Sequence, residues 1–370
     1  MTTDTLSTMS PSTSDQPARI ARSLDTYRLL GRSGLRVSPL ALGTMTFGPD
    51  WGWGAGRNEA RRMFDVYHER GGNFIDTANN YTGGTSERLV GEFVRDRRDQ
   101  LVLATKYSCF TRAGDPNSGG NHRKSMIASV ESSLQRLGTD YIDLLYLHVW
   151  DGTTPVEEIM RGLDDLVRSG KVLYIGISDT PAWQVSRMHA IAQLRGWAPP
   201  IALQLEYSLI ERTGERDLIP MAHELGLGVL PWSPLAKGVL TGKYSCADLD
   251  ATDGPESRKT IAAAAGVLSE RGLAIADAVR EIAAEIGHTP AQVALAWTLS
   301  NPAVTAPIIG ARTPSQLEDN LGALEVTFTD DQHARLHDAS AIDLGFPHEL
   351  LNRPRTRGHV FDGTHVENYT

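Results

Sequence analysis

Four residues carry side chains whose combined chemistry fits proton transfer to an oxygen atom: Asp76, Tyr81, Lys106 and His148. A tyrosine with its ordinary pKa of about 10 exchanges protons poorly at neutral pH. A neighbouring ammonium favours the phenolate and lowers that pKa, and a carboxylate beside the lysine keeps the ammonium charged and in place. A histidine can hydrogen-bond the substrate oxygen and orient it. Together these side chains predict a proton donor that serves a carbonyl oxygen as negative charge develops there.

Each of these side chains also has a plainer interpretation. Asp76 could cap a loop, Tyr81 could pack in the core, and His148 could be a core histidine with satisfied hydrogen bonds. Lys106 could pair with a surface acid, or it could form a Schiff base as in an aldolase. The joint assignment is favoured because Asp76, Lys106 and His148 each follow directly on a short apolar run.

These runs belong to a regular alternation of short apolar segments with longer segments of helical period. The apolar segments predict strands at residues 40–42, 73–75, 101–105, 142–147, 172–177, 202–205, 228–230 and 306–309. Helical periodicity predicts helices at 58–69, 86–94, 124–137, 155–168, 182–194, 217–224, 290–299, 315–323 and 330–340. Eight strands, each followed by a helix, predict an α/β protein with a (β/α)8 TIM barrel, an extra C-terminal helix and long active-site loops.

The main alternative fold is a doubly wound parallel sheet. Its first βα turn normally carries G-x-G-x-x-G, which occurs nowhere in the sequence, and Gly52, Gly54 and Gly56 lack the final spacing. A GxxxxGKS/T loop and an HExxH motif are also absent from the sequence. The barrel is therefore the preferred prediction, and it places the site at the carboxyl ends of the strands.

Composition narrows the class of protein further. With 36 Lys+Arg against 45 Asp+Glu the net charge is −9, which argues against nucleic-acid partners, because these need a basic face. Two cysteines, Cys109 and Cys246, cannot build a disulfide framework or a cysteine zinc site, so we expect no metal and a reducing compartment. No apolar run approaches the ~20 residues of a membrane span, and no signal-peptide core is found. These features predict a cytoplasmic protein without membrane partners.

The chain divides into three predicted segments. Residues 1–22 are rich in Ser and Thr and predict a disordered tail, residues 23–342 form one barrel domain, and residues 343–370 form a C-terminal tail. The apolar Phe346, Leu350 and Leu351 of this tail could cover the barrel mouth or bind a neighbouring subunit. Oligomerisation is possible, but the sequence does not specify it.

Five motifs in order make the chain similar to the aldo-keto reductases over about residues 27–340. They are Asp76–Tyr81 with 83–87, the lysine strand 101–106, the histidine strand 143–148, the segment 232–238, and Gly310–Arg312 with Gln316 and Asn320. The resemblance implies that Tyr81 is the general acid, that Lys106 tunes it, that Asp76 holds Lys106, and that His148 orients the carbonyl. It also implies NADPH/NADP+ as cofactor without a Rossmann fold, in agreement with the missing glycine fingerprint.

The same resemblance assigns the cofactor contacts by position. The nicotinamide carboxamide would lie near Ser178, Asp179 and Gln204, with Trp232 stacked on the ring. The remaining contacts would come from Gly43, Thr44, Met45, Asp76, Ser233 and Pro234, from Leu235, Lys237, Gly238 and Lys243 around the pyrophosphate, and from Gly310, Arg312, Gln316 and Asn320 at the adenosine end. An arginine binds a phosphate through two parallel hydrogen bonds, so Arg312 favours NADPH over NADH.

Two positions depart from the family pattern. Asp179 stands where many members have Asn, and an ionised carboxylate can accept a hydrogen bond from the nicotinamide amide but cannot donate one to its oxygen. Thr82 stands where glycine usually follows the tyrosine, and we expect its side chain to narrow the pocket slightly.

Aromatic residues predict the substrate class. Phe47, Trp51, Trp53, Tyr107 and Trp150 fall in or near the loops above the barrel, and an aromatic mouth suits a planar or apolar carbonyl compound. The two loop tryptophans could instead simply anchor their loop. The segments 114–122 and 245–258 are predicted to be mobile, and the second of them to fold over the pyrophosphate as a long loop does in relatives.

The predicted function is reduction of an aldehyde or ketone to the alcohol. Within the family the segment 119–124 resembles aryl-alcohol dehydrogenase-like members, which points to aryl or other bulky carbonyl substrates. The alternatives are a non-catalytic NADPH-binding regulatory subunit and a Schiff-base aldolase that uses Lys106.

Overall fold

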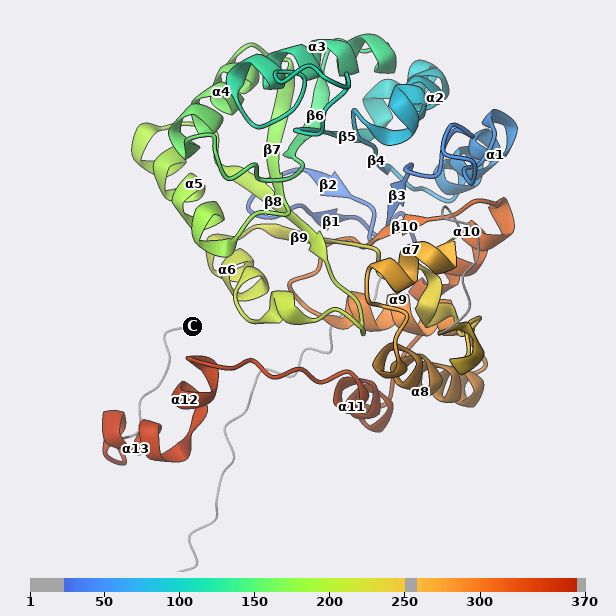
Figure 1. Cartoon of the computed structure of the whole chain (residues 1–370), viewed down its shortest axis with the longest axis vertical. Coiled ribbons are helices and arrows are strands. Elements are labelled where there is room, and N and C mark those ends of the chain that lie inside the picture. The colour runs from blue at the N-terminus through green and yellow to red at the C-terminus, as the bar shows by residue number, and fades with distance from the viewer. Residues whose placement is uncertain (1–22, 250–257, 365–370) are drawn as a thin grey trace, which may run out of the picture.

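A ring of eight parallel strands forms the centre of the computed structural model, which describes residues 23–249 and 258–364 (Figure 1). The strands are β3 (Ala41–Gly43), β4 (Phe74–Asp76), β5 (Val102–Tyr107), β6 (Ile142–Leu147), β7 (Val172–Ser178), β8 (Pro200–Glu206), β9 (Gly228–Trp232) and β10 (Ile308–Gly310). They pair in the order β10-β3-β4-β5-β6-β7-β8-β9. A parallel bridge between Val229 of β9 and Val304, in the segment just before β10, brings the two ends of this order together, so the predicted barrel is confirmed.

Helices surround the ring (Figure 1). They are α1 (Arg57–Glu69), α2 (Thr85–Val94), α3 (Arg123–Leu137), α4 (Val156–Arg168), α5 (Ala182–Arg195), α6 (Leu218–Leu225), α7 (Arg258–Ala264), α8 (Glu270–Ile286), α9 (Pro290–Ser300), α10 (Pro314–Leu321) and α11 (Asp330–Ala339). Local chemistry sets their starts: Thr289, Thr313 and Thr329 each accept a hydrogen bond from a backbone N–H in the first turn of α9, α10 and α11. Helices α7 and α8 were not among the predicted elements, because the strand-helix alternation alone does not require them.

A short antiparallel hairpin, β1 (Arg28–Leu29) and β2 (Arg36–Val37), closes one end of the ring and was also not predicted. Its Leu30 and Val37 are fully buried in a cluster with side chains of the ring strands. Gly31 has φ 56°, and a Cβ there would lie 2.2 Å from the Ile201 carbonyl oxygen, so only glycine fits this close approach. Because the hairpin fills the amino-terminal end, the carboxyl ends of the strands are left to form the site.

Short 3-10 helices occur mostly in the loops of the described chain. They are η1 (Tyr81–Gly84), η2 (Arg95–Gln100), η3 (Thr213–Glu215), η4 (Ala236–Thr241), η5 (Cys246–Asp248) and η6 (Gly322–Glu325). Helices η1 and η4 contain residues with positive φ, and both lie at the candidate site. The predicted mobile segment 245–258 lies largely outside the described residues, as does the predicted tail 1–22.

The C-terminal segment carries α12 (His348–Asn352) and α13 (Pro354–Phe361), which lie apart from the barrel (Figure 1). The side chains of Phe346 and Leu351 are exposed there. The sequence left open whether this tail covers the barrel mouth or binds a neighbouring subunit. The described part of the tail does not cover the mouth. Among the described residues no helix has the length and apolarity to span a membrane.

Candidate active site

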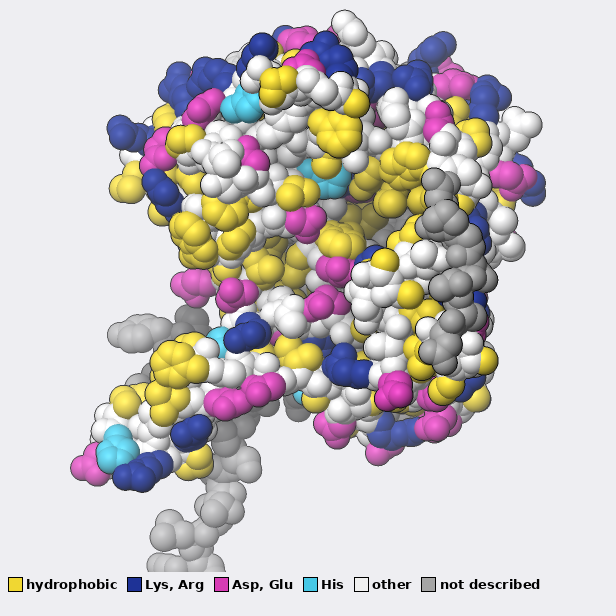
Figure 2. Space-filling model, in the orientation of Figure 1, with side chains coloured by type: hydrophobic (Ala, Val, Ile, Leu, Met, Phe, Trp, Pro, Cys, Tyr) yellow, Lys and Arg dark blue, Asp and Glu magenta, His cyan; other side chains and the backbone are white. Residues whose placement is uncertain are grey.

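The face seen in Figure 2 is hollowed near its centre, with hydrophobic side chains inside the hollow and acidic side chains at its edge. At the carboxyl ends of the ring strands, β4 ends with Asp76, β5 contributes Lys106, and His148 follows directly on β6. Tyr81 begins η1, five residues after Asp76. The barrel therefore brings together the four side chains that were predicted to act jointly.

Lys106 is the centre of this group, and its side chain is fully buried. Its Nζ donates to Asp76 Oδ1 at 2.5 Å, to the Thr77 carbonyl at 2.8 Å and to Tyr81 Oη at 3.2 Å. The second oxygen of Asp76 accepts from Gln204 Nε2 at 2.9 Å. All three ammonium protons thus have acceptors, which fixes the direction in which Lys106 presents its charge to the phenol.

The charges of the group follow from burial and from this pairing. Burial alone would lower the pKa of Lys106, but Asp76 and Tyr81 outweigh it and raise the pKa above its ordinary value. A Schiff base needs a neutral amine, so this environment disfavours the aldolase alternative. Burial raises the pKa of Tyr81, and the opposing attraction of Lys106 does not cancel the effect. Lys106 lowers the pKa of Tyr81, as predicted, but the net shift is upward. Tyr81 therefore keeps its proton at neutral pH.

His148 faces Tyr81, with ring centroids 6.1 Å apart and planes at 80°. Burial, with a smaller contribution from Lys106, lowers the pKa of His148 to about 3. The imidazole is therefore neutral at physiological pH and cannot serve as a cationic acid. It can still donate one hydrogen bond to a substrate oxygen, which leaves Tyr81 as the proton source of the group.

Thr82 supports the start of α2 and does not narrow the pocket as predicted. Its side chain is 1% exposed, and its Oγ1 donates to the Phe47 carbonyl at 2.8 Å and accepts from the Ser86 N–H at 3.0 Å. The residue adopts φ 46°, a conformation that glycine takes more easily. The hydroxyl thus turns into the protein and ties the loop after β3 to the helix that follows Tyr81.

Two loops beside His148 are joined by residues that the sequence reasoning did not assign. Asn121 is fully buried, its N–H donates to Asp151 Oδ2 at 2.8 Å, and its Oδ1 accepts from the Asp151 N–H at 2.7 Å. Its Nδ2 donates to Ser108 Oγ at 2.9 Å. One end of the segment predicted to be mobile, 114–122, is therefore held against the loop after β6. Only the position of Asn121 inside a glycine-rich stretch could have indicated this role.

The residues expected near the nicotinamide carboxamide lie together at the ends of β7, β8 and β9. Ser178 Oγ is buried and has no hydrogen-bond partner among the described residues. Asp179 Oδ1 accepts from Trp232 Nε1 at 3.0 Å, and Asp179 has φ 38°. Burial raises the pKa of Asp179. A buried hydroxyl without a partner is the kind of group that a bound amide would satisfy, so this corner fits a carboxamide.

The segment after β9 bends through several residues with positive φ: Ser233, Ala236, Lys237 and Gly238. Lys237 Nζ pairs with Glu206 at 2.6 Å and lies 5.3 Å from the centre of the Trp232 ring. A Cβ at Gly238 would lie 3.0 Å from Lys243 Nζ, so the second lysine packs against this bend. The backbone N–H groups of Ala236, Lys237 and Gly238 are bonded within the bend, so the two lysine ammonium groups are what fit a pyrophosphate here. The predicted Pro234 and Leu235 complete the same segment.

At the start of α10, Arg312 is exposed, and no described residue pairs with its guanidinium. Its backbone N–H donates to Gln316 Oε1 at 2.9 Å. Asn320, one turn further on, is buried and donates to the Gly310 carbonyl at 3.4 Å. Arg312 and Gln316 are thus placed together at the surface, whereas Asn320 mainly holds the strand end.

Of the predicted contacts on β3 and the loop after it, only Met45 has an exposed side chain. Thr44 is buried, and its Oγ1 bonds the Asp76 carbonyl at 3.0 Å and Ser86 Oγ at 2.8 Å. A Cβ at Gly43 would lie 2.7 Å from Ile308 Cγ2. The described structure therefore gives Gly43 and the Thr44 side chain roles in packing beneath the site.

The aromatic mouth contains fewer of the predicted rings than expected. Trp51 lies 5.7 Å from Trp53 and 6.4 Å from Tyr81 between ring centroids. Trp150 lies 5.9 Å from Trp183, an exposed α5 residue that was not assigned from the sequence. These four tryptophans form two pairs, one beside the phenol of Tyr81 and one at the start of α5.

Phe47 and Tyr107, by contrast, do not line the mouth. Both are 1% exposed and belong to the hydrophobic core. Successive side chains of a strand point to opposite faces, so Tyr107 points outward from the ring when Lys106 points inward. Phe47 packs on Phe93 of α2, with ring centroids 6.2 Å apart.

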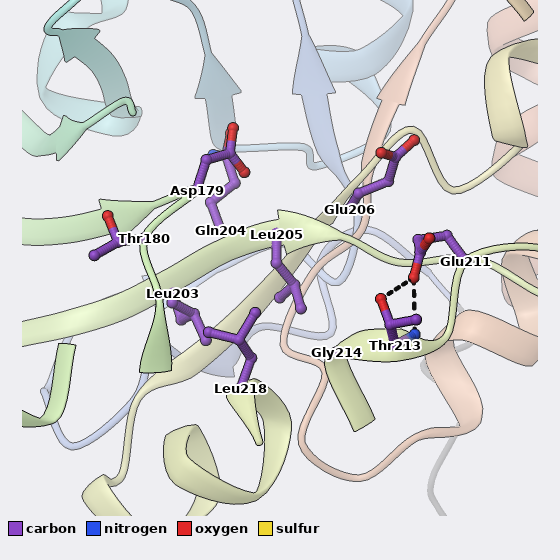
Figure 3. A pocket seen from close by; sticks show the side chains of 10 residues that line it. All are labelled: Asp179, Thr180, Leu203, Gln204, Leu205, Glu206, Glu211, Thr213, Gly214 and Leu218. Carbon is purple, nitrogen blue, oxygen red and sulfur yellow. Dashed lines mark hydrogen bonds between the residues drawn. The ribbon is translucent and has the colours of Figure 1, made fainter. Parts of the chain in front are cut away.

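A pocket of about 280 Å³ adjoins the corner formed by Ser178, Asp179 and Trp232 (Figure 3). Leu203, Leu205 and Leu218 line it from β8 and α6, and Asp179 and Glu206 lie at its edge. The side chain of Glu211 accepts hydrogen bonds from Thr213 on the far side. The pocket thus gives the site an apolar extension next to Asp179.

Comparisons with known proteins agree with this geometry. The model of the aldo/keto reductase family matches residues 39–341. The chain is 40% identical over 344 residues to a norsolorinic acid reductase of Aspergillus flavus, covering 90% of this chain and 86% of that protein. It is 38% identical over 342 residues to an aryl-alcohol dehydrogenase [NADP(+)] of Phanerodontia chrysosporium, covering 86% of each. With the barrel and the buried Asp76–Lys106–Tyr81 group, these matches show that the chain belongs to the aldo/keto reductase family.

Proposed function

We propose that this protein reduces an aldehyde or ketone to the alcohol with NADPH. The observation that carries the proposal is the buried Lys106 ammonium, held by Asp76 and directed at Tyr81 Oη 3.2 Å away. When bound, the nicotinamide supplies the hydride. The protein's own residues then have to hold the carbonyl oxygen, deliver a proton to it and support the charge that remains.

Tyr81 delivers the proton. It is protonated at neutral pH, because its ordinary pKa is already about 10 and burial raises it further, and the phenolate that forms as the proton leaves sits against the Lys106 ammonium. Neutral His148 holds the carbonyl oxygen beside the phenol by a hydrogen bond. Proton transfer by a positioned side chain contributes typically about 10²–10⁴-fold to rate, so loss of the Tyr81 hydroxyl should remove most of the turnover.

The residues expected to hold NADPH fit that group chemically. The partnerless hydroxyl of Ser178 suits the carboxamide, the bend at Lys237 and Gly238 suits the pyrophosphate, and exposed Arg312 suits a further phosphate. The name of the relative from Phanerodontia chrysosporium states NADP(+) as its cofactor. We assign the preference for NADPH over NADH to Arg312.

The substrate we propose is an aryl or similarly bulky carbonyl compound. Trp51 lies edge-on to Tyr81, and Trp53 lies against Trp51, so a planar ring could stack within reach of the phenol. The relatives include an aryl-alcohol dehydrogenase and reductases of norsolorinic acid, which supports the same class.

The test is turnover of a panel of aryl and short aliphatic aldehydes by the wild type and by Tyr81→Phe. We expect NADPH oxidation by the wild type with aryl aldehydes. We expect a loss of at least about 100-fold in the variant, with unchanged quenching of tryptophan fluorescence by NADPH. Retained turnover in Tyr81→Phe would refute the assignment of the proton donor. Saturable NADPH binding without turnover of any carbonyl would favour a non-catalytic cofactor-binding subunit.

A further inference from the structure

Cys109 lies beside the histidine of the proposed site. Its Sγ is 3.6 Å from His148 Nδ1, a distance that fits a hydrogen bond between a thiol and a ring nitrogen, and no other described group bonds this nitrogen. The thiol is half-buried in the loop after β5. Nothing in the family motifs draws attention to this residue.

The position of Cys109 is held by its neighbours. Asn79 Nδ2 donates to the Cys109 carbonyl at 3.3 Å. The preceding Ser108 contacts His148 from the same loop, because its Oγ accepts from the His148 N–H at 3.2 Å. Ser108 Oγ also accepts from Asn121 at 2.9 Å. The loop therefore fixes Cys109 against the imidazole edge through its own backbone and through the preceding Ser108.

We propose that Cys109 is a positioning residue that holds neutral His148 in the tautomer with its proton on Nε2, by donating the S–H to Nδ1. This inference rests on the proposed carbonyl reduction, in which His148 donates a hydrogen bond to the substrate oxygen. In neutral imidazole one nitrogen donates and the other accepts, and the partner of one nitrogen decides the state of the other. A donor at Nδ1 therefore leaves Nε2 as the donor toward the substrate.

The direction of this hydrogen bond follows from the two groups. Burial lowers the pKa of His148 to about 3 and raises the pKa of the Cys109 thiol, so both are neutral at physiological pH. A neutral thiol is a weak acceptor, whereas the lone pair of an imidazole nitrogen is a good one. The S–H thus donates to Nδ1. The reverse arrangement would turn the lone pair of Nε2 toward the carbonyl oxygen and repel it.

Long-range ¹H–¹⁵N correlation spectra of histidine-labelled protein read the tautomer directly, without substrate or cofactor. The variants are Cys109→Ala, which removes the donor, and Cys109→Ser, which keeps one. Cys246→Ala removes the other cysteine, which is exposed, and serves as the matched control. We expect the Nε2–H tautomer for His148 in the wild type, in Cys246→Ala and largely in Cys109→Ser. We expect a mixture of tautomers in Cys109→Ala.

Kinetics supply the second readout. The kcat for an aryl aldehyde should fall about three- to tenfold in Cys109→Ala, the range expected for one hydrogen bond, with partial rescue in Cys109→Ser and unchanged NADPH affinity. An Nδ1–H tautomer in the wild type would overturn the proposal. So would Cys109→Ala protein that keeps both the wild-type spectrum and the wild-type kcat. If no carbonyl compound is reduced at all, the proposed function fails, while the spectra still decide whether Cys109 sets the tautomer.

Discussion

Replacing Asp76 by asparagine should convert Lys106 from a fixed cation into a destabilised buried amine. Asp76 and Lys106 are 3% and 0% exposed as side chains, and removing one member of a buried ion pair costs about 3–5 kcal/mol. The carboxamide of Asp76→Asn still offers one acceptor to Nζ, so we expect about 3 kcal/mol. The matched control is Asp165→Asn, which breaks two pairs near the surface, with Arg123 and with Arg161, and each should cost at most about 1 kcal/mol.

The pH dependence of Asp76→Asn gives the sharper test. In the wild type the folded pKa of Lys106 lies above its unfolded value, so the stability that it contributes persists across the neutral range and is lost only as pH rises through the folded pKa. Without the carboxylate, burial dominates and the folded pKa falls below the unfolded value. The unfolded variant then binds more protons than the folded one, so its free energy of unfolding should rise with pH between the two pKa values.

Activity of Asp76→Asn should change with pH in the opposite direction. As Lys106 loses its proton, the Tyr81 phenolate loses its ammonium, and kcat should fall with rising pH by about 10²-fold or more relative to the wild type. The assays are urea denaturation and steady-state reduction of an aryl aldehyde at pH values from 6 to 9. An Asp76→Asn protein as stable as Asp165→Asn, with the wild-type slope of kcat against pH, would refute the reasoning.

Two further predictions concern the cofactor and the fold. Arg312→Ala should raise the Kd for NADPH about tenfold while leaving the Kd for NADH unchanged, because only NADPH offers the extra phosphate. Fluorescence titrations measure both dissociation constants. Equal weakening of NADPH and NADH binding would show that Arg312 does not select between the two cofactors. Gly31→Ala should lower the free energy of unfolding by about 1–3 kcal/mol, because φ is 56° and the new Cβ would lie 2.2 Å from the Ile201 carbonyl. The control Gly34→Ala, whose Cβ meets no atom within 4 Å, should be close to neutral in urea denaturation.

The strands and outer helices of the barrel were predictable because burial dictates their patterns. The run 142–147 is nearly all apolar because β6 is covered on both faces, and it appears in the structure with the same bounds. The hairpin of β1 and β2 was missed because two-residue strands carry too little pattern to detect. Its clearest sequence feature is Gly31. The requirement for glycine at this position becomes evident only from the structure, which places the Ile201 carbonyl against it.

The candidate site was predictable where its residues follow strands, and less so where a side chain's direction decides its role. Asp76 and Lys106 lie at the carboxyl ends of buried strands and His148 directly follows one, so topology alone gathers them. Tyr107 was placed at the mouth by its position beside Lys106, yet the alternation of a strand sends adjacent side chains to opposite faces. Thr82 was expected to narrow the pocket, and instead its hydroxyl accepts from the Ser86 N–H in the first turn of α2.

The electrostatics of the site could not be read from residue types, because burial reverses several ordinary expectations. Lys106 was expected to lower the pKa of Tyr81 below its ordinary value, but desolvation raises it. The same desolvation keeps His148 neutral. The group therefore holds one buried ion pair, Asp76 and Lys106, beside two neutral hydrogen-bonding rings. In that arrangement the tautomer of His148 matters as much as its charge, which is why a thiol at Nδ1 can influence the reaction without touching the substrate.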